Sequence, residues 1–127
     1  MKQWMCILLG GAFGTGCRYG LSLLLNAWFG RAAFPFATFI INVTGSFLIG
    51  LIAELYQVQR FTSLTWRLAL VTGVLGGYTT FSAFSLENLN LLRTGQTVTA
   101  LSYAVASVVL GLGAAWLGMR LAHVWGV

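Results

Sequence analysis

Apolar residues run along this chain in four long blocks, and short polar joints separate them. A helix needs about 20 largely apolar residues to cross a bilayer, and each block reaches that length. The predicted spans cover roughly 4–29, 36–56, 66–92 and 98–124. Since short joints connect antiparallel neighbours, the pattern predicts an all-α integral membrane protein. Residues 1–127 would form a single four-helix transmembrane domain.

Composition agrees with this class, because 58% of the 127 residues are hydrophobic and only 7% are charged. Pro35 fits the start of the second span, where its missing N–H is not needed. The first span is too long for a signal peptide and contains Arg18, so we expect no signal peptide. Cys6 and Cys17 match no metal motif, and we expect them to be buried small hydrophobic residues. Interfacial aromatic residues fall near the span ends: Trp4, Trp28, Tyr56, Trp66 and Trp125.

The third span contains a segment that is poorly suited to a continuous helix. Glycines at 73, 76 and 77 weaken it, because each costs about 1 kcal/mol relative to Ala. Hydroxyls follow at Thr79, Thr80, Ser82 and Ser85. Unwound backbone at membrane depth persists only inside protein or beside a water-filled cavity. We therefore predict a break at 76–80 that forms part of an ion or solute site, with Phe81 and Phe84 on its edge.

The glycines of the first span do not form a phosphate-binding loop. The third position of the dinucleotide fingerprint is Tyr19, and neither a preceding strand nor a Lys-Ser/Thr ending is present. Small residues spaced four apart favour close helix contacts in membranes. Two pairs have that spacing, Gly10 with Gly14 and Gly16 with Gly20.

The charges bear on partners and on topology. The net charge is +5 but the basic residues do not cluster, which excludes a nucleic-acid partner. Four spans would place both termini on one side. Lys2, Arg60, Arg67 and Arg120 flank that side, whereas Arg31 and Arg93 flank the other. So weak a bias permits insertion in both orientations, and this predicts an antiparallel, dual-topology homodimer.

Arg18 is the one charge well inside an apolar span, at a cost of at least about 2.5–3.5 kcal/mol at a helix centre. Two interpretations stay open: an electropositive lining for an anion path, or an arginine that snorkels or caps a helix. Glu54 and Glu87 are the only acids. Glu87 lies about two turns beyond the break, where it can pair with an arginine or face a vestibule.

Polar residues recur at helical spacing in two further spans. The second span has Thr38, Asn42 and Ser46, and the fourth has Tyr103 and Ser107 followed by Gly111. Residues four apart share a helix face. Hydrogen bonds between helices are one explanation. A polar ion track is the one we favour, because polar positions interrupt three of the four spans.

The chemistry of these positions favours a small anion. No ring of acids, as in many cation pores, is present. Amide and hydroxyl donors dominate, and aromatic ring edges carry partial positive charge. Phe81 and Phe84 share their helix face with Ser85 and Asn88. A small hydrated anion needs such dense compensation for its lost water.

Taken together, three features resemble the small fluoride channels called Fluc or CrcB. They are Arg18 after a glycine-rich first span, Ile-Asn-Val-Thr-Gly-Ser-Phe at 41–47, and Gly-Gly-Tyr-Thr-Thr-Phe-Ser-Ala-Phe at 76–84. The resemblance covers all four spans. It implies a passive channel rather than an enzyme, in the form of an antiparallel homodimer with two pores in the bacterial inner membrane. Its partners would be the fluoride ion, a second copy of the chain and the lipid bilayer.

The resemblance also implies roles for individual residues. Phe81 and Phe84 match the pore phenylalanines, and Asn42 matches the asparagine that orients them. Arg18 would line an electropositive vestibule. Polar positions along the ion path would be Thr38, Tyr103 and Ser107, with Thr80 and Ser82 as further candidates. A structural Na⁺ at the dimer centre would be held by the backbone carbonyls of Gly76 and Thr79 from both subunits.

Some positions depart from the family pattern, which often reads Gly-Gly-x-Ser-Thr-Phe-Ser-Thr-Phe. Thr79 replaces a serine, Ala83 removes a hydroxyl, and Gly111 stands where some relatives have serine.

Three rival classes fit less well. Small multidrug transporters need a glutamate in the first span, and this span has none. A membrane enzyme would need a base beside a nucleophile, and the only histidine, His123, lies at the C-terminal edge. An accessory subunit without transport would not need aligned polar stripes.

Overall fold

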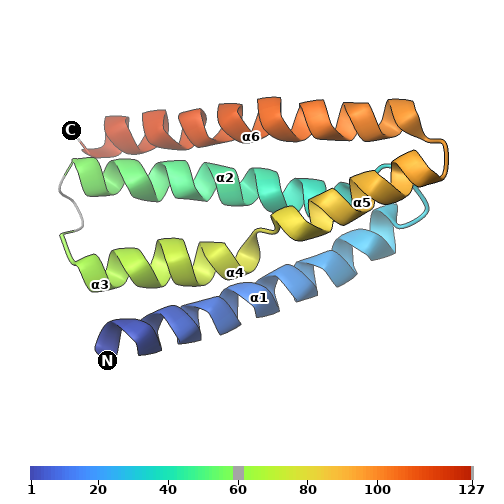
Figure 1. Ribbon diagram of the computed structural model, residues 1–127. Helices are drawn as coiled ribbons and strands as arrows, with labels where there is room; N and C mark the ends of the chain where they lie inside the picture. Colours follow the sequence, from blue (N-terminus) through green and yellow to red (C-terminus); the bar gives the residue numbers. More distant parts are fainter. Residues whose placement is uncertain (59–61, 127) are drawn as a thin grey trace.

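The computed structural model describes residues 1–58 and 62–126, and within them every regular element is helical. The long helices run antiparallel, with both termini at the same end of the molecule (Figure 1). In chain order the elements are α1 (Lys2–Phe29), α2 (Phe36–Gln57), α3 (Leu64–Arg67), the π-helical segment η1 (Leu68–Leu75), α4 (Gly76–Tyr78), α5 (Phe81–Arg93) and α6 (Thr97–Gly126).

Three regions of the described chain are long and apolar enough to cross a membrane: Phe36–Gln57, Leu64–Arg93 and Thr97–Trp125. They support a multi-pass membrane protein. The helix α1 has 28 residues and matches the predicted range of 4–29, but it is not among these three. Its glycines and Arg18 lower its mean hydropathy, so length alone supports a fourth span there.

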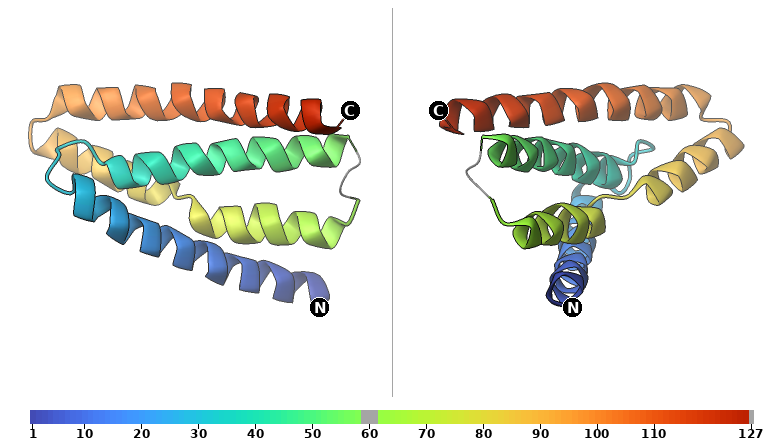
Figure 2. Two further views of the ribbon diagram at one scale, coloured as in Figure 1. Left: turned by 180° about the vertical axis from the view of Figure 1, so that it is seen from behind. Right: turned by 60° about the vertical axis from the view of Figure 1, so that its left-hand side comes forward.

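Glycines allow two pairs of helices to approach closely. The helix α2 packs along α6, and α1 packs beneath the α3–η1–α4 segment (Figure 2). A Cβ on Gly50 would collide with the Ala115 carbonyl, and one on Gly10 would lie 2.6 Å from the Ala69 carbonyl oxygen. Gly14 is likewise blocked by the Val74 carbonyl. The predicted Gly10 and Gly14 contact is therefore confirmed.

Two expectations for α1 are wrong within the single chain. A Cβ added to Gly16 or Gly20 would meet no neighbouring atom within 4 Å. Cys17 is exposed, whereas Cys6 is half-buried. Two residues along an α-helix turn it by about 200°, so Gly16 faces away from the surface that carries Gly14.

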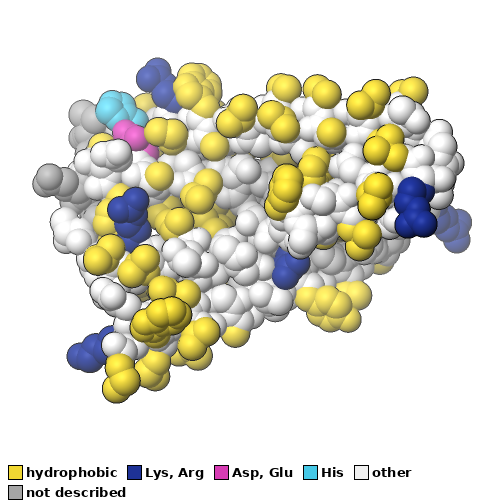
Figure 3. All heavy atoms as spheres, viewed as in Figure 1, with side chains coloured by type: hydrophobic (Ala, Val, Ile, Leu, Met, Phe, Trp, Pro, Cys, Tyr) yellow, Lys and Arg dark blue, Asp and Glu magenta, His cyan; other side chains and the backbone are white. Residues whose placement is uncertain are grey.

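Most of the basic residues lie toward the helix ends, but Arg18 lies well inside α1. Apolar side chains are spread over the face of the molecule that Figure 3 shows. Lys2 begins α1, and Arg67 ends α3 at the end of the molecule that holds both termini. Arg31 follows α1 and Arg93 ends α5 at the opposite end. Arg60, the remaining predicted flanking charge of the loop after α2, lies outside the described residues.

The helical run from Leu64 to Arg93 is interrupted at two residues. Thr79 has φ −85° and ψ 159°, and Thr80 has φ −152° and ψ 115°, so both are extended. Gly76 and Gly77, which fall inside the predicted range of 76–80, remain helical in α4. The helix resumes at Phe81 in a different direction (Figure 2).

Candidate functional site

Side chains replace the backbone hydrogen bonds that would continue the helix through Thr79 and Thr80. In an α-helix each N–H donates to the carbonyl four residues earlier. The N–H of Thr80 donates instead to Oδ1 of Asn42 at 2.8 Å. The N–H of Ala83 donates to Oγ1 of Thr80 at 3.2 Å, which makes Thr80 the N-cap of α5. The carbonyls of Gly76 and Thr79 are thereby released from their helical donors.

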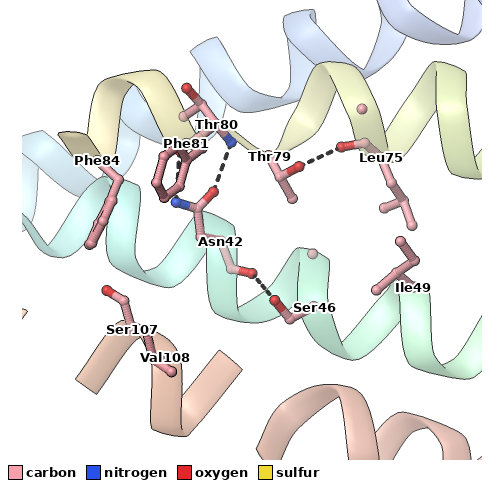
Figure 4. Close-up of a pocket in the computed structure, with 12 residues that line it drawn as sticks. Asn42, Ser46, Ile49, Leu75, Thr79, Thr80, Phe81, Phe84, Ser107 and Val108 are labelled. Atoms are coloured by element: carbon pink, nitrogen blue, oxygen red, sulfur yellow. Dashed lines mark hydrogen bonds between the residues drawn. The ribbon is translucent and has the colours of Figure 1, made fainter. Parts of the chain in front are cut away.

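Asn42 holds the break from the side of α2. Its Nδ2 also donates to the Thr80 carbonyl at 3.0 Å, so both amide atoms bind the backbone of one residue. Figure 4 shows the Asn42 side chain beneath the break. A second link joins Thr44 and Tyr78, whose hydroxyls lie 2.8 Å apart.

Arg18 holds the break from the side of α1. Its Nε donates to the carbonyl of Gly77 at 3.0 Å, and the Thr15 hydroxyl reaches the same oxygen at 3.5 Å. In a continuous helix that carbonyl would accept from Phe81. This geometry favours helix capping, one of the two interpretations left open by the sequence. The side chain is half-buried and also lines a pocket, described below.

A first pocket of about 390 Å³ lies beside the break and is open to the surface. Both phenylalanines line it: the Phe81 ring is 79% exposed, and the Phe84 ring is half-buried. Their centroids are 5.5 Å apart, and the Tyr103 ring lies 4.9 Å from that of Phe84. The lining comprises Asn42, Gly45, Ser46, Ile49, Leu75, Gly76, Thr79, Thr80, Phe81, Phe84, Ser107 and Val108 (Figure 4).

Ser107 supplies this pocket with an unused donor. Its hydroxyl oxygen is buried and has no hydrogen-bond partner in the described part of the chain. It faces Phe84 across the pocket (Figure 4). By contrast, the Ser46 hydroxyl already donates to the Asn42 carbonyl at 2.8 Å. Because nearly all buried polar groups have partners, Ser107 is an exception among the described residues that line this pocket.

A second pocket of about 450 Å³ lies on the other side of the break, between Arg18 and Glu87. Two predicted polar residues meet at this glutamate. The Thr38 hydroxyl donates to Oε1 at 2.6 Å, and the Tyr103 hydroxyl donates to Oε2 at 2.8 Å. Thr38 is 8% exposed and Tyr103 is fully buried. Both hydroxyls therefore bind one shared carboxylate, and Thr38 and Glu87 also line the second pocket.

Sequence reasoning left the role of Glu87 undecided. The sequence feature that could have indicated this role is the position of Glu87, the only acid of that span, three residues after Phe84. Residues three apart lie on the same helix face. That feature placed the carboxylate near the aromatic face but gave no indication of its two hydroxyl donors.

Other polar residues near the break do not line the first pocket. Ser82 is exposed, and its hydroxyl lies 3.3 Å from that of Thr80. The Ser85 hydroxyl donates to the Phe81 carbonyl at 2.9 Å, and the Asn88 amide donates to the Phe84 carbonyl at 3.2 Å. Their donors serve their own helix. The polar character of this helix face therefore does not extend into the pocket.

Among the described residues, no cluster of three or more His, Cys, Asp or Glu side chains could hold a metal ion. A hard cation would have to use oxygen ligands from the backbone or from hydroxyls. The released carbonyls of Gly76 and Thr79 fit that chemistry, and Gly76 is exposed. They are suitable ligands only for a cation that also finds further oxygens.

Comparison with known proteins gives a consistent result. The family model described as CrcB-like protein, Camphor Resistance (CrcB), matches residues 5–119. A protein of Rhizobium meliloti named fluoride-specific ion channel FluC is 48% identical over 123 residues, which cover 95% of this chain and 96% of the relative. Proteins of the same name from Thermus thermophilus and Granulibacter bethesdensis are 47% and 44% identical, each over 121 residues and 95% of this chain, and 95% and 94% of the relative.

Proposed function

The chain belongs to the CrcB-like family, and we propose that it is a passive fluoride-selective channel. Its relatives are named fluoride-specific ion channels, which are not enzymes. Its role would be to export cytoplasmic fluoride across the bacterial inner membrane and so lower fluoride toxicity.

The first pocket carries this proposal. It combines two phenylalanine rings with the unpartnered hydroxyl of Ser107. A small anion that leaves water needs strong compensation. Ring edges are partially positive, and a free hydroxyl donor adds a directed hydrogen bond. No acidic side chain lines the pocket, so no carboxylate there opposes an anion.

The proposed path continues from this pocket along the polar residues near Tyr103. Phe81 and Phe84 would contact the ion at the break, and Asn42 would keep them in place through the Thr80 backbone. Thr38 and Tyr103 would hold the Glu87 carboxylate in place, since both of their hydroxyls donate to it. Thr80 caps α5 and has a structural part in the path. Ser82 is exposed and would serve only if a second subunit covered it.

We further propose that the channel is an antiparallel, dual-topology homodimer with two pores. The Phe81 ring is 79% exposed, and the first pocket is open, so a single chain does not enclose the path. The weak difference in flanking charge between the two ends would allow both orientations. The helix α1 would provide the fourth span, with the break of the third at membrane depth.

A structural Na⁺ at the dimer centre is part of the same proposal. The carbonyls of Gly76 and Thr79 would hold it, two from each subunit, as oxygen ligands suit a hard cation. Bound Na⁺ would supply fixed positive charge and tie the two breaks together. Asn42 and the Thr80 cap keep these carbonyls out of the helical ladder.

The direction of transport follows from simple electrostatics. Hydrogen fluoride is neutral, crosses the bilayer and ionises in the near-neutral cytoplasm. A passive anion pore lets the trapped fluoride leave, and an interior-negative potential favours its exit by roughly 2.3 kcal/mol per charge per 100 mV. No nucleotide is needed to drive this movement.

The test is halide efflux from liposomes that contain the purified protein, followed with fluoride and chloride electrodes. Fast fluoride release with negligible chloride release is expected. Absence of fluoride release from a folded, reconstituted protein would refute the proposal, and equal release of both halides would refute selectivity.

A further inference from the structure

We infer that Arg18 is a positioning residue for the helix break, and that its Nε–H donor, rather than its charge, is what the break requires. The Arg18 side chain makes this contact through Nε, which donates to the Gly77 carbonyl at 3.0 Å. Only the second readout of this inference rests on the proposed channel function.

The Gly77 carbonyl is one of the acceptors that a continuous helix through the break would need. In a continuous helix it would take the N–H of Phe81. Here Arg18 occupies it, with a longer contact from Thr15 at 3.5 Å. By occupying this carbonyl, the Arg18 donor stabilises the interrupted conformation.

Close packing of α4 on α1 makes this contact possible. A Cβ on Gly77 would lie 3.0 Å from both the backbone N and the hydroxyl of Thr15, and it would collide with the Gly11 carbonyl. Only glycine lets the two backbones meet this closely. Thr15 and Arg18 are three residues apart and so reach the Gly77 carbonyl from one face of α1.

The break is thus held from two opposite helices. Asn42 of α2 binds the Thr80 backbone by two hydrogen bonds, and Arg18 of α1 binds the carbonyl three residues earlier. A clamp on one side only would leave the end of α4 free to shift along α1. Arg18 therefore completes the framework that fixes where Phe81 begins α5.

Arg18 also lines the second pocket, so its charge and its hydrogen bond must be separated experimentally. Three substitutions do so. Arg18→Gln keeps a nitrogen donor at the same number of bonds from Cα as Nε and removes the charge. Arg18→Met has similar length without donor or charge. Arg18→Lys keeps the charge but places its nitrogen one bond further out.

Amide hydrogen exchange, measured by NMR on the purified protein in micelles, is the first readout. In Arg18→Met we expect Thr79 and Thr80 to exchange about tenfold faster, because an orphaned carbonyl and a lost charged hydrogen bond loosen the end of α4. In Arg18→Gln we expect exchange within about twofold of the natural sequence. Equal exchange in Gln and Met variants, or no change in Met, would overturn the inference.

Fluoride efflux from liposomes is the second readout. Arg18→Gln should retain more efflux than Arg18→Met by about tenfold. If instead Arg18→Lys retains efflux and both neutral variants lose it together, the charge is what matters and the inference fails. If the natural sequence shows no fluoride efflux, the proposed function fails, while the exchange experiment still decides the role of Arg18.

Discussion

Asn42 binds the backbone of Thr80 through both atoms of its side-chain amide, with Nδ2 donating to the carbonyl at 3.0 Å and Oδ1 accepting from the N–H at 2.8 Å. This pairing resembles the exchange of hydrogen bonds between two strand residues. It gives the N–H of the extended residue an acceptor and its carbonyl a donor, and so makes an interruption tolerable inside an apolar environment.

Replacing Asn42 with alanine should destabilise the protein and abolish most fluoride efflux. The half-buried N–H of Thr80 would lose its acceptor and the Thr80 carbonyl would lose a donor, and an N–H left without an acceptor costs up to about 1–3 kcal/mol. Unfolding in denaturant and liposome efflux measure the two effects. Asn88→Ala is the matched control, because the Asn88 amide donates only to the Phe84 carbonyl of its own helix. Equal effects of the two substitutions would contradict this account of the break.

Phe81→Ile and Phe84→Ile should each remove fluoride efflux while the protein stays folded. The Phe81 ring is 79% exposed in the single chain, so its loss affects stability little. The Phe84 ring packs at 4.9 Å from that of Tyr103, and its loss should destabilise by about 1 kcal/mol.

Phe13→Ile is the control for the phenylalanine variants. Phe13 lies on α1 and is 66% exposed, and it does not line the first pocket. Its substitution should leave efflux unchanged. Normal efflux in both Phe81→Ile and Phe84→Ile would place the ion path elsewhere.

Ser107→Ala should separate stability from function. The Ser107 hydroxyl is buried without a partner in the part of the chain that the structure describes, so removing it relieves a desolvation penalty of about 1–3 kcal/mol. We therefore expect unchanged or higher thermal stability together with slower fluoride efflux. Ser102→Ala, an exposed position on the same helix, should change neither quantity. Slower efflux accompanied by clear destabilisation would show that the hydroxyl serves packing instead.

Glu87 and Tyr103 should be energetically coupled. The Tyr103 hydroxyl donates to Oε2 of Glu87 at 2.8 Å, and the tyrosine is fully buried. A double-mutant cycle of Glu87→Gln and Tyr103→Phe, read by denaturant unfolding, should give an interaction free energy of about 1–3 kcal/mol. Additive effects, within about 0.5 kcal/mol, would mean that the hydrogen bond contributes nothing to folding.

Sequence patterns predicted the helices well where hydrophobic length and turn residues specify them. The second span was predicted at 36–56, directly after Pro35, and the helix runs Phe36–Gln57. The fourth was predicted at 98–124 and runs Thr97–Gly126. Such boundaries depend on local composition, which the sequence contains.

Contacts between helices were harder to predict, because they depend on how each helix is rotated about its axis. Ser85 and Asn88 share a face with the phenylalanines, yet both donate to carbonyls of their own helix. Thr38 and Tyr103 were expected along the ion path, but helical spacing could not show that they meet at Glu87. Helical spacing shows which residues share a face of one helix, but it does not show which residues of another helix they contact.

Thr80→Val should weaken sodium binding at the break. Val lacks the Oγ1 that accepts from the Ala83 N–H. This N–H can then donate to the Thr79 carbonyl, as in an ordinary helix. That carbonyl is one of the proposed Na⁺ ligands. For the natural sequence, Na⁺ at 100 times its dissociation constant should stabilise the fold by about 2.7 kcal/mol, measured by thermal unfolding against a large organic cation.

In Thr80→Val we expect the half-saturating Na⁺ concentration to rise about tenfold, the equivalent of about 1.4 kcal/mol. Thr80→Ser keeps the hydroxyl and is the matched control, so its sodium dependence should stay that of the natural sequence. If Na⁺ stabilises all three proteins alike, the N-cap does not control the Thr79 carbonyl. If Na⁺ stabilises none of them, the break holds no sodium, and its released carbonyls are satisfied by water or by the partner subunit.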